Sequence, residues 1–69
     1  MDNRISYLNK CIRAIVKVGP IEAGELVYCF LETDSHFYVN VMTPKYGVIT
    51  EIKVANYLKD HFVIKGYEN

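Results

Sequence analysis

Tryptophan is absent from this chain, and cysteine, proline and glycine are scarce, with two, two and four residues respectively. Two cysteines are fewer than most secreted mini-domains use to stabilise themselves through disulfides. We therefore expect Cys11 and Cys29 to be reduced, buried thiols. Together with His36 and His61 they lack the spacing of metal ligands, and no Cys-x-x-Cys motif is present. The sequence therefore predicts no metal site and no cofactor.

A net charge of either sign is also lacking, because eight basic residues balance eight acidic ones. Domains that bind DNA or RNA mostly carry a basic excess, since phosphate contacts dominate their affinity. The balance therefore favours a protein partner over nucleic acid. It also removes charge repulsion between copies of the chain, which favours self-association.

Long apolar runs are missing as well, and none approaches the roughly 20 residues that a membrane-spanning helix needs. Residues 1–10 contain the acidic Asp2 and no apolar stretch of signal-peptide length. We therefore expect a soluble protein that stays in the cytoplasm and does not bind a membrane.

Hydrophobic residues are abundant, at 51% of the 69 residues, and aromatic residues make up 13%. This composition disfavours disorder and supplies the dense core that a single small domain requires. Glycine and proline divide the chain into segments of strand length. We predict strands over 10–18, 25–32, 37–42, 48–54 and 62–65, and one helical or 3₁₀ turn over 55–61.

Alternation of side chains predicts which strand faces are buried. Gly24 lies in the turn before the second strand and is expected to have a positive φ. Tyr28 and Tyr57 are both expected to belong partly to the core. In the first strand the buried face is predicted to hold Ile12, Ala14, Val16 and Val18. In the second strand Leu26, Tyr28 and Phe30 are predicted to share one face, and Val27, Cys29 and Leu31 the other.

Five short strands at this spacing favour a small barrel or a two-sheet sandwich. The run from Ile21 to Tyr28 resembles the hydrophobic-x-x-Gly-x-hydrophobic-x-aromatic entry into the second strand of SH3-like proteins. Residues 57–62 are similar to their helical turn before the last strand. Cys11-Ile12 resembles the beginning of the barrel in small SH3-like proteins encoded by tailed bacteriophages. The resemblance covers residues 10–65.

The resemblance implies a mainly β, five-stranded SH3-like barrel with one short helical turn before the last strand. Residues 1–9 are then an N-terminal arm or a short helix, and residues 66–69 a frayed tail. A phage-encoded protein of this kind would bind a host protein in the host cytoplasm and inhibit or redirect it. The chain lacks the tryptophan, the Pro-x-x-Tyr and the long acidic loop with which other SH3 domains bind proline-rich peptides, so that ligand is not expected.

Tyrosine supplies the candidate binding residues, because its apolar ring and polar end suit recognition surfaces. Tyr38 shares a strand face with Asn40, and Tyr46 lies beside Lys45 in the loop before the fourth strand. The arm carries apolar side chains that we expect to be exposed and able to pair two copies as a homodimer. The predicted binding residues are Tyr38, Asn40, Lys45 and Tyr46, with Ile5, Tyr7 and Leu8 in the arm.

Two other functions are alternatives to a protein-interaction module. A nucleic-acid-binding barrel would use Lys45, Lys53, Tyr38 and Tyr46, which combine stacking rings with positive charge. An enzyme would need Cys29 activated by a histidine, but a thiol in the middle of an apolar strand is ordinarily inert. We therefore predict a non-enzymatic protein-interaction module, with nucleic-acid binding as the alternative.

Overall fold

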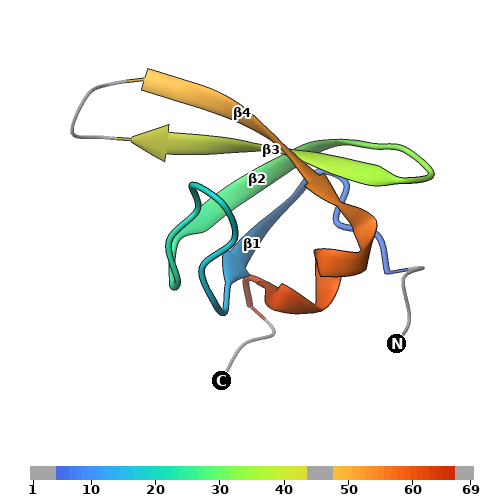
Figure 1. Ribbon diagram of the computed structural model, residues 1–69, viewed down its shortest axis with the longest axis horizontal. Helices are drawn as coiled ribbons and strands as arrows, with labels where there is room; N and C mark the ends of the chain where they lie inside the picture. Colours follow the sequence, from blue (N-terminus) through green and yellow to red (C-terminus); the bar gives the residue numbers. More distant parts are fainter. Residues whose placement is uncertain (1–4, 44–47, 67–69) are drawn as a thin grey trace.

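The computed structural model describes residues 5–43 and 48–66, and this part of the chain is mainly β. Its strands are β1 (Lys10–Ala14), β2 (Leu26–Glu32), β3 (His36–Thr43), β4 (Val48–Ala55) and β5 (Phe62–Ile64), with the 3₁₀ helix η1 (Asn56–His61) before β5. All neighbouring strands are antiparallel, in the order β4-β3-β2-β1-β5 (Figure 1). The described sheet is open, with β4 and β5 at its edges. These residues include no helix with the length and hydrophobicity that crossing a membrane requires.

Four of the five predicted strands and the predicted 3₁₀ turn are confirmed to within a residue or two, but the first strand is shorter than predicted. It ends at Ala14, whose carbonyl accepts a hydrogen bond from the Gly24 N–H at 2.7 Å. Val16 is therefore exposed, contrary to the alternation. Val18 returns to the core through an isolated bridge with Ile21. Gly24 has the expected positive φ, at 86°.

The core lies on one face of the sheet and is built around three aromatic rings. The Phe37 ring is fully buried and meets Tyr7 and Phe62 edge to face, at centroid distances of 5.7 and 5.6 Å. Such edge-to-face pairs stabilise beyond the area they bury. The other buried apolar residues are Ile12, Ala14, Val18, Ile21, Val27, Cys29, Val39, Val41 and Val54.

A β-bulge in β2 overturns part of the predicted alternation. Cys29 lies opposite Val39 in β3, whereas Leu31 lies opposite Tyr38, so that Phe30 and Leu31 face one residue of the partner strand. An extra residue in one strand reverses the faces beyond it. Leu31 is therefore 45% exposed, where the alternation placed it beside the buried Cys29.

Three further burial predictions are wrong. Tyr28 is 40% exposed and Tyr57 is 73% exposed, so neither belongs to the core. Cys11 is an exposed free thiol, whereas Cys29 is a buried one, as expected. Cys11 and Tyr28 lie opposite each other in β1 and β2, on the face of the sheet that points away from the core. The outer face therefore exposes more apolar side chains than we predicted from the alternation.

Candidate functional site on the outer face of the sheet

An apolar surface covers the middle of the outer face of the sheet. Tyr38 and Asn40 alternate with the buried Phe37, Val39 and Val41, so they point away from the core. The register places Tyr28 opposite Asn40, and Leu31 opposite Tyr38. We call this set the outer-face patch, and its members are Tyr28, Phe30, Leu31, Tyr38 and Asn40.

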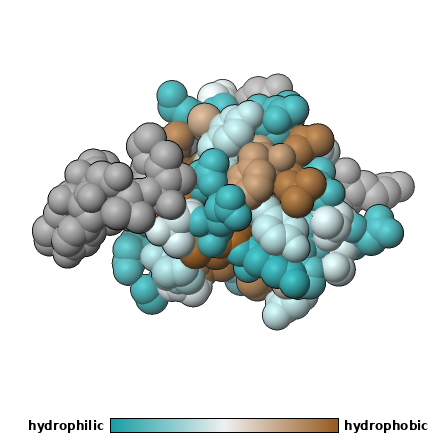
Figure 2. Space-filling view, turned by 90° about the horizontal axis from the view of Figure 1, so that it is seen from above, coloured by the Kyte–Doolittle hydropathy of each residue, from teal (hydrophilic) through white to brown (hydrophobic). Residues whose placement is uncertain are grey.

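The outer-face patch combines exposure with aromatic contacts. Phe30 packs against Tyr38 with a centroid distance of 6.4 Å and an interplanar angle of 52°. The Tyr28 hydroxyl donates to the Asn9 side-chain oxygen at 3.2 Å, which fixes the orientation of this ring. Phe30, Tyr38 and Asn40 are half-buried by their neighbours. Figure 2 shows one side of the molecule, where a small group of apolar side chains lies among hydrophilic ones.

Charged residues of both signs border the outer-face patch on β4. Lys53 lies opposite Tyr38 and Glu51 opposite Asn40, and both charged side chains are exposed. Their charges cancel, so this edge of the patch has no field of one sign. A surface with this balance lacks the basic excess that phosphate binding ordinarily uses.

The sequence correctly predicted that two residues of this surface share one strand face. Tyr38 and Asn40 lie together on the outer face, as expected from the period of two in β3. Lys45 and Tyr46, the other two residues predicted for this surface, lie outside the described residues. Leu31 was missed because only the bulge turns it outward, and Phe30 was missed because Tyr28, on the same face, was expected to belong partly to the core. No signal in the printed sequence marks the bulge.

Of the three residues predicted to be exposed in the N-terminal segment, two are exposed and one is buried. Ile5 and Leu8 are exposed, as expected, and residues 5–9 contain no helix. The expectation for Tyr7 is wrong, since it is only 4% exposed. Its hydroxyl lies 2.8 Å from the Lys59 carbonyl and 3.1 Å from that of Phe62, and donates its hydrogen to them. Because these two carbonyls accept the hydroxyl hydrogen, the Tyr7 ring can be buried.

A buried ion pair holds the N-terminal segment against the sheet. The Lys59 ammonium lies 3.3 Å from the Glu32 carboxylate and donates to the Ile5 carbonyl at 2.6 Å. The carboxylate also accepts hydrogen bonds from the Tyr7 backbone N–H at 2.7 Å and the Ser6 hydroxyl at 2.8 Å. A charged lysine can be buried here because its donors are matched to acceptors.

Burial and hydrogen bonding shift two pKa values in this cluster in opposite senses. Burial by itself would raise the pKa of Glu32, but the hydrogen bonds from Tyr7, Ser6 and Lys59 outweigh it and lower that pKa. The pKa of Tyr7 is raised, first by burial and then by the negative charge of Asp60. At neutral pH Glu32 is therefore ionised and Tyr7 is a neutral donor.

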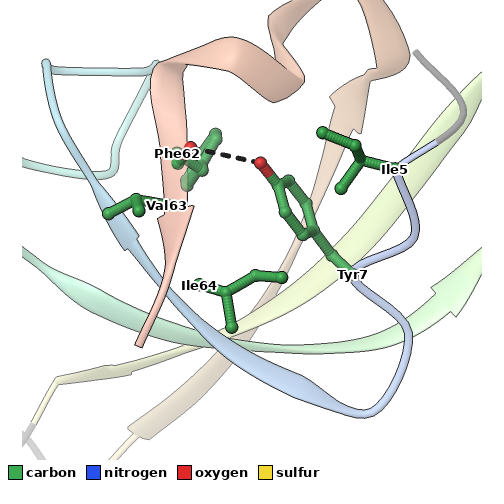
Figure 3. A pocket seen from close by; sticks show the side chains of 5 residues that line it. All are labelled: Ile5, Tyr7, Phe62, Val63 and Ile64. Carbon is green, nitrogen blue, oxygen red and sulfur yellow. Dashed lines mark hydrogen bonds between the residues drawn. The ribbon is translucent and has the colours of Figure 1, made fainter. Parts of the chain in front are cut away.

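A shallow apolar hollow of about 210 Å³ lies between the N-terminal segment and β5. Figure 3 shows Ile5 and Tyr7 on one side and Phe62, Val63 and Ile64 on the other, with the Tyr7 hydroxyl directed at the Phe62 backbone. The side chains lining it carry no charge, and its tyrosine hydroxyl is already hydrogen-bonded. It offers hydrophobic contact and no group for chemistry.

Cys29, the residue considered as a nucleophile, is unsuited to that role. It is fully buried, and burial raises its pKa, which disfavours the reactive thiolate. Its sulfur contacts the Leu31 carbonyl at 3.6 Å, and no hydrogen bond joins it to His36 or His61 within the described residues. His36 instead contacts the Ser35 hydroxyl at 2.7 Å. The described residues also contain no group of three side chains placed to hold a metal ion.

Comparison of the chain with protein-family models, with curated proteins and with solved structures found no match.

Proposed function

We propose that this chain is a small SH3-like barrel that acts as a non-enzymatic protein-interaction module. The strand order β4-β3-β2-β1-β5 and the 3₁₀ helix between β4 and β5 support the SH3-like assignment. The resemblance to phage proteins supports a host protein in the cytoplasm as the partner, which binding would inhibit or redirect. This last step rests on analogy of fold, whereas the binding surface rests on the residues.

The observation that carries the proposal is the bulge in β2. It turns Leu31 onto the outer face, which already carries Tyr28, Phe30 and Tyr38. The bulge brings Glu32 to the core face beside Lys59 and leaves Leu31 45% exposed on the face that carries Tyr28, Phe30 and Tyr38. Aromatic and apolar side chains are typical of the centre of a protein–protein interface, and a polar rim without net charge is typical of its border.

The test compares two substitutions of exposed apolar residues. Leu31→Glu places a charge in the outer-face patch, and Tyr57→Glu places the same charge at an exposed position outside it. Proteins captured from lysate of the source cell by the wild-type chain are identified by mass spectrometry, and the affinity of a captured protein is measured by calorimetry. We expect Leu31→Glu to weaken binding at least about tenfold, while Tyr57→Glu binds like the wild type.

Urea denaturation of both variants checks that each retains the fold. Equal binding by Leu31→Glu and the wild type would exclude the outer-face patch as the interface.

Nucleic-acid binding is examined in parallel with a single-stranded oligonucleotide at low salt. Affinity that falls steeply with added salt would replace the proposal by the nucleic-acid alternative, because phosphate contacts have that signature.

A further inference from the structure

The β4 strand has a backbone edge that other parts of the sheet do not cover. It lies at one end of the strand order, and within residues 5–43 and 48–66 only β3 pairs with it (Figure 1). At the other end of the sheet, β5 is three residues long and its Phe62 carbonyl accepts the Tyr7 hydroxyl. An edge strand of eight residues such as β4 is a template for pairing with another strand.

The hydrogen-bond pattern shows which backbone groups of β4 point outward. The Asn56 N–H donates to the Ser35 carbonyl, and the register continues without a break through β3 and β4. Hydrogen-bonded and non-hydrogen-bonded pairs alternate along antiparallel strands. Counting in steps of two from the hydrogen-bonded pair Ser35–Asn56 shows that Val39–Ile52 is also a hydrogen-bonded pair. Ile52 therefore directs its N–H and C=O toward β3, whereas Glu51 and Lys53 direct theirs away from the sheet.

We propose that β4 pairs with β4 of a second copy of this chain, in antiparallel orientation about a twofold axis at Ile52. In this register Glu51 lies opposite Lys53 of the second copy, and Lys53 opposite Glu51. Both are hydrogen-bonded pairs, so the outward N–H and C=O groups of all four residues are satisfied. Ile52 meets its own counterpart in a close, non-hydrogen-bonded pair on the core face.

Charge favours this register over the two registers next to it. Shifting the axis to Glu51 sets two carboxylates opposite each other, and shifting it to Lys53 does the same with two ammonium groups. Opposite charges across strands stabilise a pair, and like charges destabilise it. Within the described residues the structure forms no ion pair on Glu51 or Lys53, so both are placed to make these contacts.

The proposed dimer joins the two sheets into one continuous sheet. Because the axis is perpendicular to the strands and to the sheet, the outer faces of both copies lie on the same side. Two outer-face patches would then be presented together. The dimer stands independently of the proposed partner protein, since it uses the edge of β4 and not the patch.

The test measures molecular mass by sedimentation equilibrium over a concentration series at low salt. We expect the wild-type chain to approach twice its mass of 8.0 kDa as concentration rises. Glu51→Lys and Lys53→Glu each turn both cross-strand pairs into like-charge pairs, so each variant should dimerise at least about tenfold more weakly. Both positions are exposed, and urea denaturation of each variant checks that it is folded.

An equimolar mixture of the two variants provides the decisive control. Two lysines on one chain then face two glutamates on the other, so a heterodimer should form with about the affinity of the wild-type dimer. A wild-type chain that remains monomeric at every concentration would overturn the proposal. A mixture that associates no better than either variant alone would overturn the register.

Discussion

The ammonium of Lys59 lies 3.3 Å from the carboxylate of Glu32, and both side chains are largely buried. The carboxylate also binds the Tyr7 N–H, and the ammonium binds the Ile5 carbonyl. One ion pair therefore joins the N-terminal segment, β2 and η1, which are far apart in sequence. Because removing one partner leaves a buried charge without its counterion, the two residues should act as a unit.

Stability should depend on pH through Glu32. Its pKa is lower in the folded chain than its ordinary value of 4.5, so the folded state is favoured while the carboxylate is ionised. This contribution is complete above about pH 5 and is lost as the pH falls below 4.5 through the lower folded-state pKa. Glu32→Gln should destabilise by about 2 kcal/mol at pH 7. The difference from the wild type should shrink as the pH approaches 3.

Urea denaturation of both chains from pH 7 to pH 3 measures this difference directly. Other carboxylates titrate in both chains and cancel in the comparison. A difference that stays constant over the whole range would show that Glu32 is not held ionised by its neighbours.

The Lys59–Glu32 pair should be strongly coupled in a double-mutant cycle. Lys59→Met alone leaves the Glu32 carboxylate without its cation, and Glu32→Gln alone leaves a buried ammonium. The double variant removes both charges, so its loss of stability should be smaller than the sum of the single losses by about 1–3 kcal/mol. Additive losses in urea denaturation would mean that the two charges act independently.

Tyr7 should contribute through its ring more than through its hydroxyl. Tyr7→Phe keeps the edge-to-face contact with Phe37 and removes the hydrogen bonds to the Lys59 and Phe62 carbonyls, so we expect a loss of about 1–2 kcal/mol. Tyr7→Ala also empties the volume of the ring and should cost about 3–5 kcal/mol. Thermal or urea unfolding gives both values. Tyr57→Ala, at an exposed position, is the control and should change stability by less than about 0.5 kcal/mol.

The sequence predicted the elements of the fold better than the burial of particular residues. Strands and the 3₁₀ turn follow from local patterns, and Tyr38 and Asn40 were placed correctly because β3 alternates without interruption. Leu31 was misplaced because a bulge depends on how two strands pair, and the residue pattern of one strand does not show that pairing. Tyr7 was misplaced because its hydroxyl partners in Lys59 and Phe62 lie more than 50 residues away along the chain.

The two cysteines should differ sharply in reactivity. Cys11 is exposed on the outer face, so a thiol reagent reaches it in the folded chain. Cys29 is fully buried and burial raises its pKa, so it should react only when the chain opens, at least about a hundredfold more slowly. A chromogenic disulfide reagent should therefore release one fast equivalent from the native chain and two in denaturant. Cys11→Ser should abolish the fast equivalent, and a fast reaction that persists in this variant would show that Cys29 is accessible.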